Sequence, residues 1–218
     1  AAGTHDNLST MLHEAGHAFH SCYSSDLDLI EERNPPLEFA EVASMSMELM
    51  SHPDWGEFYS DEDARRAKLD DLEKIVCFLP WMATIDAFQH WVYANPEHTR
   101  QDRSEYWLEL RGRFGPRTDW SGFEELKETS WQSQLHLFQV PFYYIEYGIA
   151  QLGALQLWQH HRRDAADGLA RYARALRLGN TKPLPELFEA AGLDLGFDEE
   201  HVASLIGELS EAMAEIRA

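Results

Sequence analysis

Two histidines and a glutamate near the start of the chain have the spacing of a metal site. Residues 13–20 read His-Glu-Ala-Gly-His-Ala-Phe-His. His13 and His17 are four residues apart, so on a helix their rings project from one face and can reach a single ion. Glu14 is offset from this pair and can hold a water molecule at the metal without being a ligand. The motif predicts a zinc site for hydrolysis; the alternative is a helix whose histidines only pack or face solvent.

A zinc site for hydrolysis needs three protein ligands and an open fourth position. Because no cysteine lies nearby, the third ligand should be His, Asp or Glu. The segment 37–50 offers Glu38, Glu41 and Glu48 on one helical face, and periodicity alone does not choose among them. Small residues in this segment would let its backbone approach the first helix closely. They are Ala40, Ala43, Ser44 and Ser46.

The first motif resembles the metal helix of the thimet oligopeptidase and oligoendopeptidase F peptidases, which has the form His-Glu-x-Gly-His-x-x-His. A second segment, 39–48, is similar to the family's second metal segment. On that match Glu41 is the third zinc ligand, and Glu48 is its neighbour on the same helix. The chain matches every fixed position of the first motif, with His13, Glu14, Gly16, His17 and His20.

A third segment, 141–148, reads Pro-Phe-Tyr-Tyr-Ile-Glu-Tyr-Gly and looks like the family's substrate-binding tyrosine segment. The resemblance implies that Tyr144 and Tyr147 donate hydrogen bonds to the oxyanion that develops during catalysis. A tyrosine hydroxyl suits this role because it stays protonated at neutral pH. His136, just upstream, would contact substrate or assist. The alternative is an aromatic core stripe, which is the role expected for Tyr143.

The resemblance implies a zinc-dependent endopeptidase that hydrolyses internal bonds of short oligopeptides. One Zn²⁺ ion per chain, held by His13, His17 and Glu41, would activate a water molecule. Glu14 would accept the proton of this water as general base and pass it to the leaving amine. The three segments are closest to the bacterial oligoendopeptidase F branch.

Members of this family are far longer than 218 residues, so we expect this chain to be their C-terminal catalytic portion. The alternative is a non-catalytic metal-binding or peptide-binding fragment that needs the N-terminal half for activity. The intact Glu14 favours an enzyme, because a binding module needs no general base. The sequence leaves the oligomeric state and the cleavage-site preference open.

Three further polar residues lie near the predicted ligands and are left out of the catalytic set. His20 follows His17 by three residues, so it either supports the ligands or packs between helices. Glu38 and Glu48 either orient a ligand histidine or are only solvated.

The elements that carry these residues are predicted to be helices, because no strand alternation is strong enough to build a sheet on. We expect an all-α, zincin-like helical catalytic domain over 1–218, with the metal motif on one helix and the third ligand on the next. Asp6 is the expected N-cap of the first helix. The expected later helices cover 37–50, 61–93 with a kink or break near Pro80, 103–114, 141–158, 164–178, 184–191 and 198–216.

Composition limits the partners. Hydrophobic residues make up 44% and charged residues 26%, a normal balance for a globular protein, and the net charge is −20. Such a field repels nucleic acid and suits a neutral or basic substrate or a metal cation. The apolar stretch 75–94 contains Pro80 and Asp86, so we interpret it as a buried helix and expect no membrane association. The two lone cysteines, Cys22 and Cys77, are expected to be packed thiols and favour a cytoplasmic location.

Overall fold

Residues 3–218 are described by a computed structural model, and none of them lies in a β-strand. This confirms the predicted all-α fold class. The chain forms two compact units, one up to Glu73 together with Ile149–Ala218, and one of Lys74–Gly148. Each unit is described by itself below. The single catalytic domain expected over 1–218 stays a prediction.

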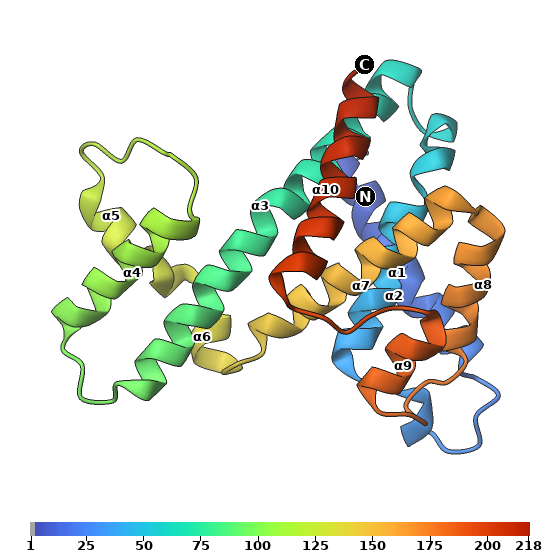
Figure 1. Ribbon diagram of the computed structural model, residues 1–218, viewed down its shortest axis with the longest axis horizontal. Helices are drawn as coiled ribbons and strands as arrows, with labels where there is room; N and C mark the ends of the chain where they lie inside the picture. The colour runs from blue at the N-terminus through green and yellow to red at the C-terminus, as the bar shows by residue number, and fades with distance from the viewer. Residues whose placement is uncertain (1–2) are drawn as a thin grey trace. The chain divides into compact units, whose positions relative to one another are not determined.

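The first unit contains the metal motif (Figure 1). Its complete elements are α1 (His5–Tyr23), the 3-10 turns Glu31–Arg33 and His52–Glu57, α2 (Leu37–Met50), α8 (Ala165–Leu176), α9 (Leu184–Ala191) and α10 (Glu199–Arg217). It also holds the first part of α3 (Asp61–Ala94) and the larger part of α7 (Tyr144–Arg163).

The core of the first unit fixes α2 in place. Phe39 and Val42 of α2 are fully buried and pack in one cluster with Leu157 of α7, Tyr172 of α8 and Phe188 of α9. Burying each large side chain contributes about 1.5–3 kcal/mol. The hydroxyl of Tyr172 also donates a 2.9 Å hydrogen bond to the carbonyl of Ala43. One side of α2 is therefore anchored in the core.

A glycine lets α1 approach α2 closely, as predicted from the small residues of α2. Gly16 is buried, and a Cβ atom built on it would lie 2.5 Å from the Cα of Ser44 and 2.7 Å from the carbonyl oxygen of Ala43. Only glycine fits this crossing without separating the backbones. Figure 1 shows the two helices side by side. The crossing lies between the positions of the two motif histidines along α1.

The second unit is built on the later part of α3. Its other elements are α4 (Arg100–Phe114), α5 (Glu124–Thr129), a 3-10 turn (Ser130–Ser133), α6 (His136–Gln139) and the first residues of α7. Ile85, Phe88, Trp107 and Leu110 form its buried core. Thr99 begins α4 through a reciprocal pair of capping hydrogen bonds with Asp102.

Several helix boundaries differ from the sequence prediction. The first helix, α1, has Thr4 rather than Asp6 at its N-cap position. The short helices α5 and α6 lie in a stretch for which the sequence predicts no helix. No break occurs at Pro80, and α3 continues through it. Proline removes only the one hydrogen bond to the carbonyl of Val76, four residues earlier, and the helix continues on both sides of it. The helix expected to begin at Pro141 begins instead at Tyr144. Phe142 has a positive φ of 61° and donates its N–H to Oε1 of Gln89 at 2.8 Å, which holds it outside the helix.

Two other sequence expectations can be compared with the described residues. The prediction that the cysteines are packed is wrong, because Cys22 and Cys77 are both exposed free thiols. Across residues 3–218, no helix combines the length and apolar character that a membrane span requires.

Candidate metal centre

His13, His17 and Glu41 come together at the crossing of α1 and α2. Each of the three offers one ligand atom, and these atoms lie within 4.8 Å of one another. The imidazole rings of His13 and His17 have centroids 5.0 Å apart and are almost perpendicular, at 84°. Nε2 of His13 lies 3.4 Å from Oε2 of Glu41. Two imidazole nitrogens and a carboxylate oxygen at such separations can converge on one cation.

Glu48 orients the first histidine from the side away from Glu41. Its Oε1 lies 2.7 Å from Nδ1 of His13, and its Oε2 accepts a 2.9 Å hydrogen bond from the hydroxyl of Ser9. A carboxylate at Nδ1 holds the ring proton there and leaves Nε2 with a lone pair for a metal. This is the arrangement expected around a metal-ligating histidine.

Glu41 is buried and held by its own helix. The hydroxyl of Ser44 donates to Oε2 of Glu41 at 3.2 Å and to the Glu41 carbonyl at 3.0 Å. Burial alone would raise the pKa of Glu41, but the hydrogen bond and charge of His13 and the charge of His17 outweigh it. The pKa of Glu41 therefore lies below its ordinary value, and the carboxylate is ionised at neutral pH.

The group has the electrostatics of a cation site. Hydrogen bonds to Glu41 and then to Glu48 raise the pKa of His13 to about 10, although burial opposes this shift. A single positive charge is thus strongly favoured between the two carboxylates. The same field favours a bound metal cation, which would take the place of the proton on Nε2 of His13.

The other residues of the motif differ in their surroundings. Glu14 lies on α1 beside His13 and is exposed to solvent. His20 is 2% exposed and packs its ring 6.1 Å from that of Phe39. Neither nitrogen of His20 has a hydrogen-bond partner among the described residues. Burial, with a smaller effect from His17, lowers the pKa of His20 to about 4, so this ring is neutral. Glu38 is half-buried and is not part of the three-residue group.

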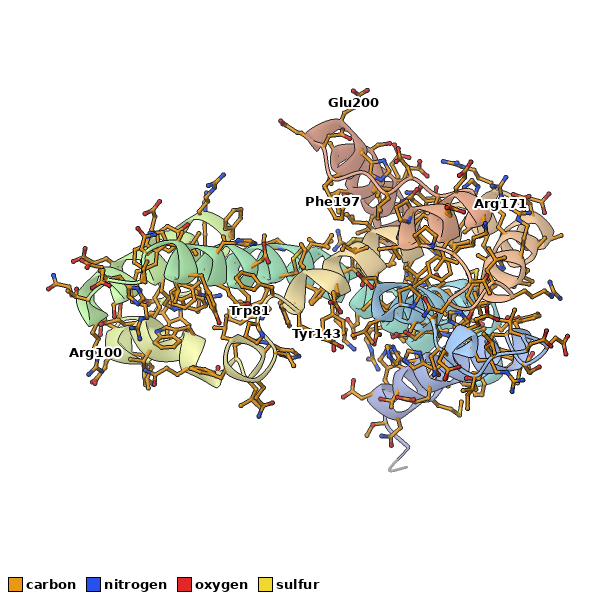
Figure 2. The ribbon with its side chains drawn as sticks, turned by 90° about the horizontal axis from the view of Figure 1, so that it is seen from below. Trp81, Arg100, Tyr143, Arg171, Phe197 and Glu200 are labelled. Atoms are coloured by element: carbon orange, nitrogen blue, oxygen red, sulfur yellow. The ribbon has the colours of Figure 1, made fainter. Side chains whose placement is uncertain are left out.

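His136, Tyr144 and Tyr147 form a cluster of their own in the second unit. The His136 ring centroid lies 4.9 Å from that of Tyr144 and 5.9 Å from that of Tyr147. Tyr143, labelled in Figure 2, is half-buried and stacks on His136 with ring centroids 5.9 Å apart, so it belongs to this cluster. The side-chain amide of Gln134 lies 2.7 Å from Nδ1 of His136. Burial raises the pKa of Tyr144, so its hydroxyl keeps its proton at neutral pH.

A supporting role for Glu48 could not be derived from the sequence, which left it undecided between orienting a histidine and being solvated. The only sequence signal is its position seven residues, or two helical turns, after Glu41. The role of Ser9 could not be predicted from the sequence, because its hydrogen bond to Glu48 joins two different helices.

The crossing of α1 and α2 therefore presents two histidines and a carboxylate as a candidate metal site. The profile of peptidase family M3 matches residues 3–205 of this chain. The chain therefore belongs to peptidase family M3.

Individual relatives agree with this membership. An oligoendopeptidase F homolog from Mycoplasma pneumoniae is 24% identical over an alignment of 206 residues, with 88% of this chain and 34% of the relative covered. The solved structure of PZ peptidase A with an inhibitor is 33% identical with a TM-score of 0.89, over 99% of this chain and 38% of that one. A crystal structure assigned to oligoendopeptidase F is 35% identical with a TM-score of 0.88, over 97% of this chain and 37% of that one. The chain thus spans just over a third of the length of these relatives.

Proposed function

We propose that this chain carries the active site of a zinc-dependent endopeptidase that hydrolyses internal bonds of short oligopeptides. The observation that carries the proposal is the convergence of His13, His17 and Glu41 ligand atoms within 4.8 Å of one another. Membership of peptidase family M3 supports the peptidase activity.

Zinc suits this donor set better than a hard cation does. Two imidazoles and one carboxylate, with a fourth position left open, are typical of zinc sites for hydrolysis. Mg²⁺ and Ca²⁺ prefer oxygen ligands only. We therefore assign His13, His17 and Glu41 as the ligands of one Zn²⁺ ion per chain. When bound, the ion supplies Lewis-acid chemistry, which acidifies water and polarises a carbonyl group.

Glu14 is the proposed general base. It neighbours the ligand His13 but stays outside the three-residue ligand group, and its carboxylate is exposed to solvent rather than held by a protein partner in that group. In the proposed reaction Glu14 accepts the proton of the attacking water and then gives it to the leaving amine. Glu48 positions His13 through the 2.7 Å contact at Nδ1 and takes no proton in this scheme.

The tyrosine cluster is proposed to stabilise the oxyanion. Tyr144 is a neutral donor at working pH, because burial keeps its pKa above the usual value, and the ring of Tyr147 lies 5.8 Å from it. Neutral donors stabilise negative charge on the carbonyl oxygen without making the site cationic. His136, in ring contact with both, is proposed to bind substrate or to assist these donors.

The substrates are proposed to be peptides that are neutral or basic, because the chain carries a net charge of −20. We further propose that the enzyme acts in the cytoplasm, on the evidence of two cysteines that form no pair.

The test is cleavage of an internally quenched fluorescent peptide by the zinc-loaded chain and by its Glu14→Gln variant. We expect the variant to bind one zinc ion and to lose about 10²–10⁴-fold in kcat/KM, which is the usual contribution of a general base. Glu38→Gln is the matched control and should keep the wild-type rate. Equal rates for wild type and Glu14→Gln would overturn the role of Glu14. Zinc binding without any Glu14-dependent cleavage would instead support a fragment that needs its N-terminal half.

A further inference from the structure

A pocket in the second unit surrounds one guanidinium group with apolar side chains. Its volume is about 350 Å³, within the range of about 300–1,000 Å³ typical of small-molecule sites. Arg103 of α4 is the only charged residue in its lining. The apolar walls include Phe88, Val92, Trp131, Leu137 and Phe138.

Arg103 has one hydrogen-bond partner and no ion-pair partner among the described residues. No carboxylate among residues 3–218 forms an ion pair with it, although acidic residues outnumber basic ones by 38 to 18. Its Nε donates a 2.8 Å hydrogen bond to Nε2 of His98. Nδ1 of His98 is hydrogen-bonded to the carbonyl of Asn95, so the two ring nitrogens of His98 face different partners. The two Nη groups of Arg103 have no hydrogen-bond partner in the described part of the chain.

Aromatic contacts hold the guanidinium in place. Its central carbon lies 5.4 Å from the ring centroid of Trp131, which restricts the side chain and orients its planar face. Trp131 is itself stacked on Phe138 at 5.8 Å and contacts Phe88 at 5.5 Å. A fixed guanidinium with free Nη donors matches the two oxygens of a carboxylate, and the surrounding rings suit a large apolar group.

Hydrogen bonds connect the lining of this pocket to the segment that carries the tyrosine cluster. Gln89, in its lining, accepts a hydrogen bond from the N–H of Phe142 at 2.8 Å and lies 3.5 Å from the carbonyl of Leu137. Leu137 and Phe138 directly follow His136 in the chain. A ligand in the pocket therefore contacts the helix that contains His136.

We propose that this pocket binds an organic carboxylate that carries a large apolar group. The carboxylate pairs with the Nη groups of Arg103, and the apolar group packs between Trp131, Phe88 and Phe138. The free C-terminal residue of a peptide and a free aromatic acid share this chemistry. The proposal is independent of the proposed peptidase activity, because binding is measured without cleavage.

The experiment titrates the 218-residue chain by calorimetry with four small probes. We expect N-acetylphenylalanine to bind at least ten times more tightly than its C-terminal amide, which lacks the charge, and than N-acetylalanine, which lacks the ring. The fourth probe, 3-phenylpropionate, distinguishes the two sources. If 3-phenylpropionate binds more weakly than N-acetylphenylalanine, the ligand is the C-terminal residue of a peptide. If the two bind equally, the ligand is a free aromatic acid.

Two arginine variants locate the site. Arg103→Gln should lower the affinity of the chain for N-acetylphenylalanine at least tenfold. Arg100→Gln, which changes an exposed arginine at the start of the same helix (Figure 2), should bind like wild type. Equal binding of the acid and the amide by wild type would overturn the proposal without relying on a variant that must fold. An Arg103→Gln variant that keeps wild-type affinity and a wild-type circular dichroism spectrum would also overturn it.

Discussion

Replacing Gly16 with alanine perturbs the helix crossing that positions the metal group. The added Cβ would lie 2.5 Å from the Cα of Ser44, 2.7 Å from the carbonyl oxygen of Ala43 and 2.9 Å from the amide nitrogen of Ser44. These are backbone atoms of α2, so they cannot rotate away as a side chain could. Carbon contacts are most favourable near about 3.5–4.0 Å, so α1 and α2 must separate locally by about 1 Å or more.

The change in the free energy of unfolding follows from two opposing effects. Alanine is favoured over glycine in a helix by about 1 kcal/mol. Overpacking costs about 1–3 kcal/mol, and a contact against backbone belongs at the upper end of that range. We therefore expect Gly16→Ala to lower the free energy of unfolding by roughly 1–2 kcal/mol. The separation also lengthens the 3.4 Å contact between His13 and Glu41, so zinc affinity should fall at least about tenfold, as when groups that orient metal ligands are disturbed.

Urea unfolding and zinc titration against a competing chelator measure both effects. Gly207→Ala is the matched control, because Gly207 lies in α10 of the same unit and a Cβ there meets no atom within 4 Å. In this control the free energy of unfolding should rise by up to about 1 kcal/mol, and the zinc affinity should stay unchanged. The reasoning is refuted if Gly16→Ala matches Gly207→Ala in both stability and zinc affinity.

Three further predictions concern single side chains of the first unit. Glu48→Gln removes the carboxylate that lies 2.7 Å from Nδ1 of His13, so zinc affinity should drop about 10–100-fold in the chelator assay; an unchanged affinity would contradict its positioning role. Tyr172→Phe removes the hydrogen bond to the Ala43 carbonyl and should cost about 1 kcal/mol in urea unfolding, whereas no loss would show that water replaces it. His20 is neutral when folded, with a pKa of about 4, but is protonated below about pH 6.5 when unfolded, so stability should fall by up to about 3 kcal/mol from pH 6.5 to pH 4. His20→Leu should flatten this decline, and an equally steep profile in the variant would count against a buried neutral ring.

Much of the helical fold was predictable because local signals mark its boundaries. The predicted helices over 37–50 and 184–191 match α2 and α9 in extent, since a proline before each helix sets its start. The start of α7 was not predictable, because Pro141 is a favourable first helical residue and nothing local excludes that position. What excludes it is the hydrogen bond from Phe142 to Gln89, which lies 53 residues earlier.

Without the family resemblance, which named Glu41, the candidate site was predictable only as far as residue spacing could bring side chains onto one helical face. Spacing placed His13 and His17 together on one helix. Choosing between Glu41 and Glu48 required the relative position of two helices, which periodicity along one helix does not contain. In the structure Glu41 faces Nε2 of His13 and Glu48 faces Nδ1, so the two carboxylates take different roles on the same ring.

The central claim is that His13, His17 and Glu41 bind one zinc ion. Zinc analysis of the purified chain, combined with anomalous diffraction at the zinc absorption edge, tests this claim most directly. The account predicts one zinc ion per chain, with a single anomalous peak bonded to these three residues at about 2.0–2.2 Å. A chain that binds no zinc at micromolar concentration, or an anomalous peak on other residues, would contradict it.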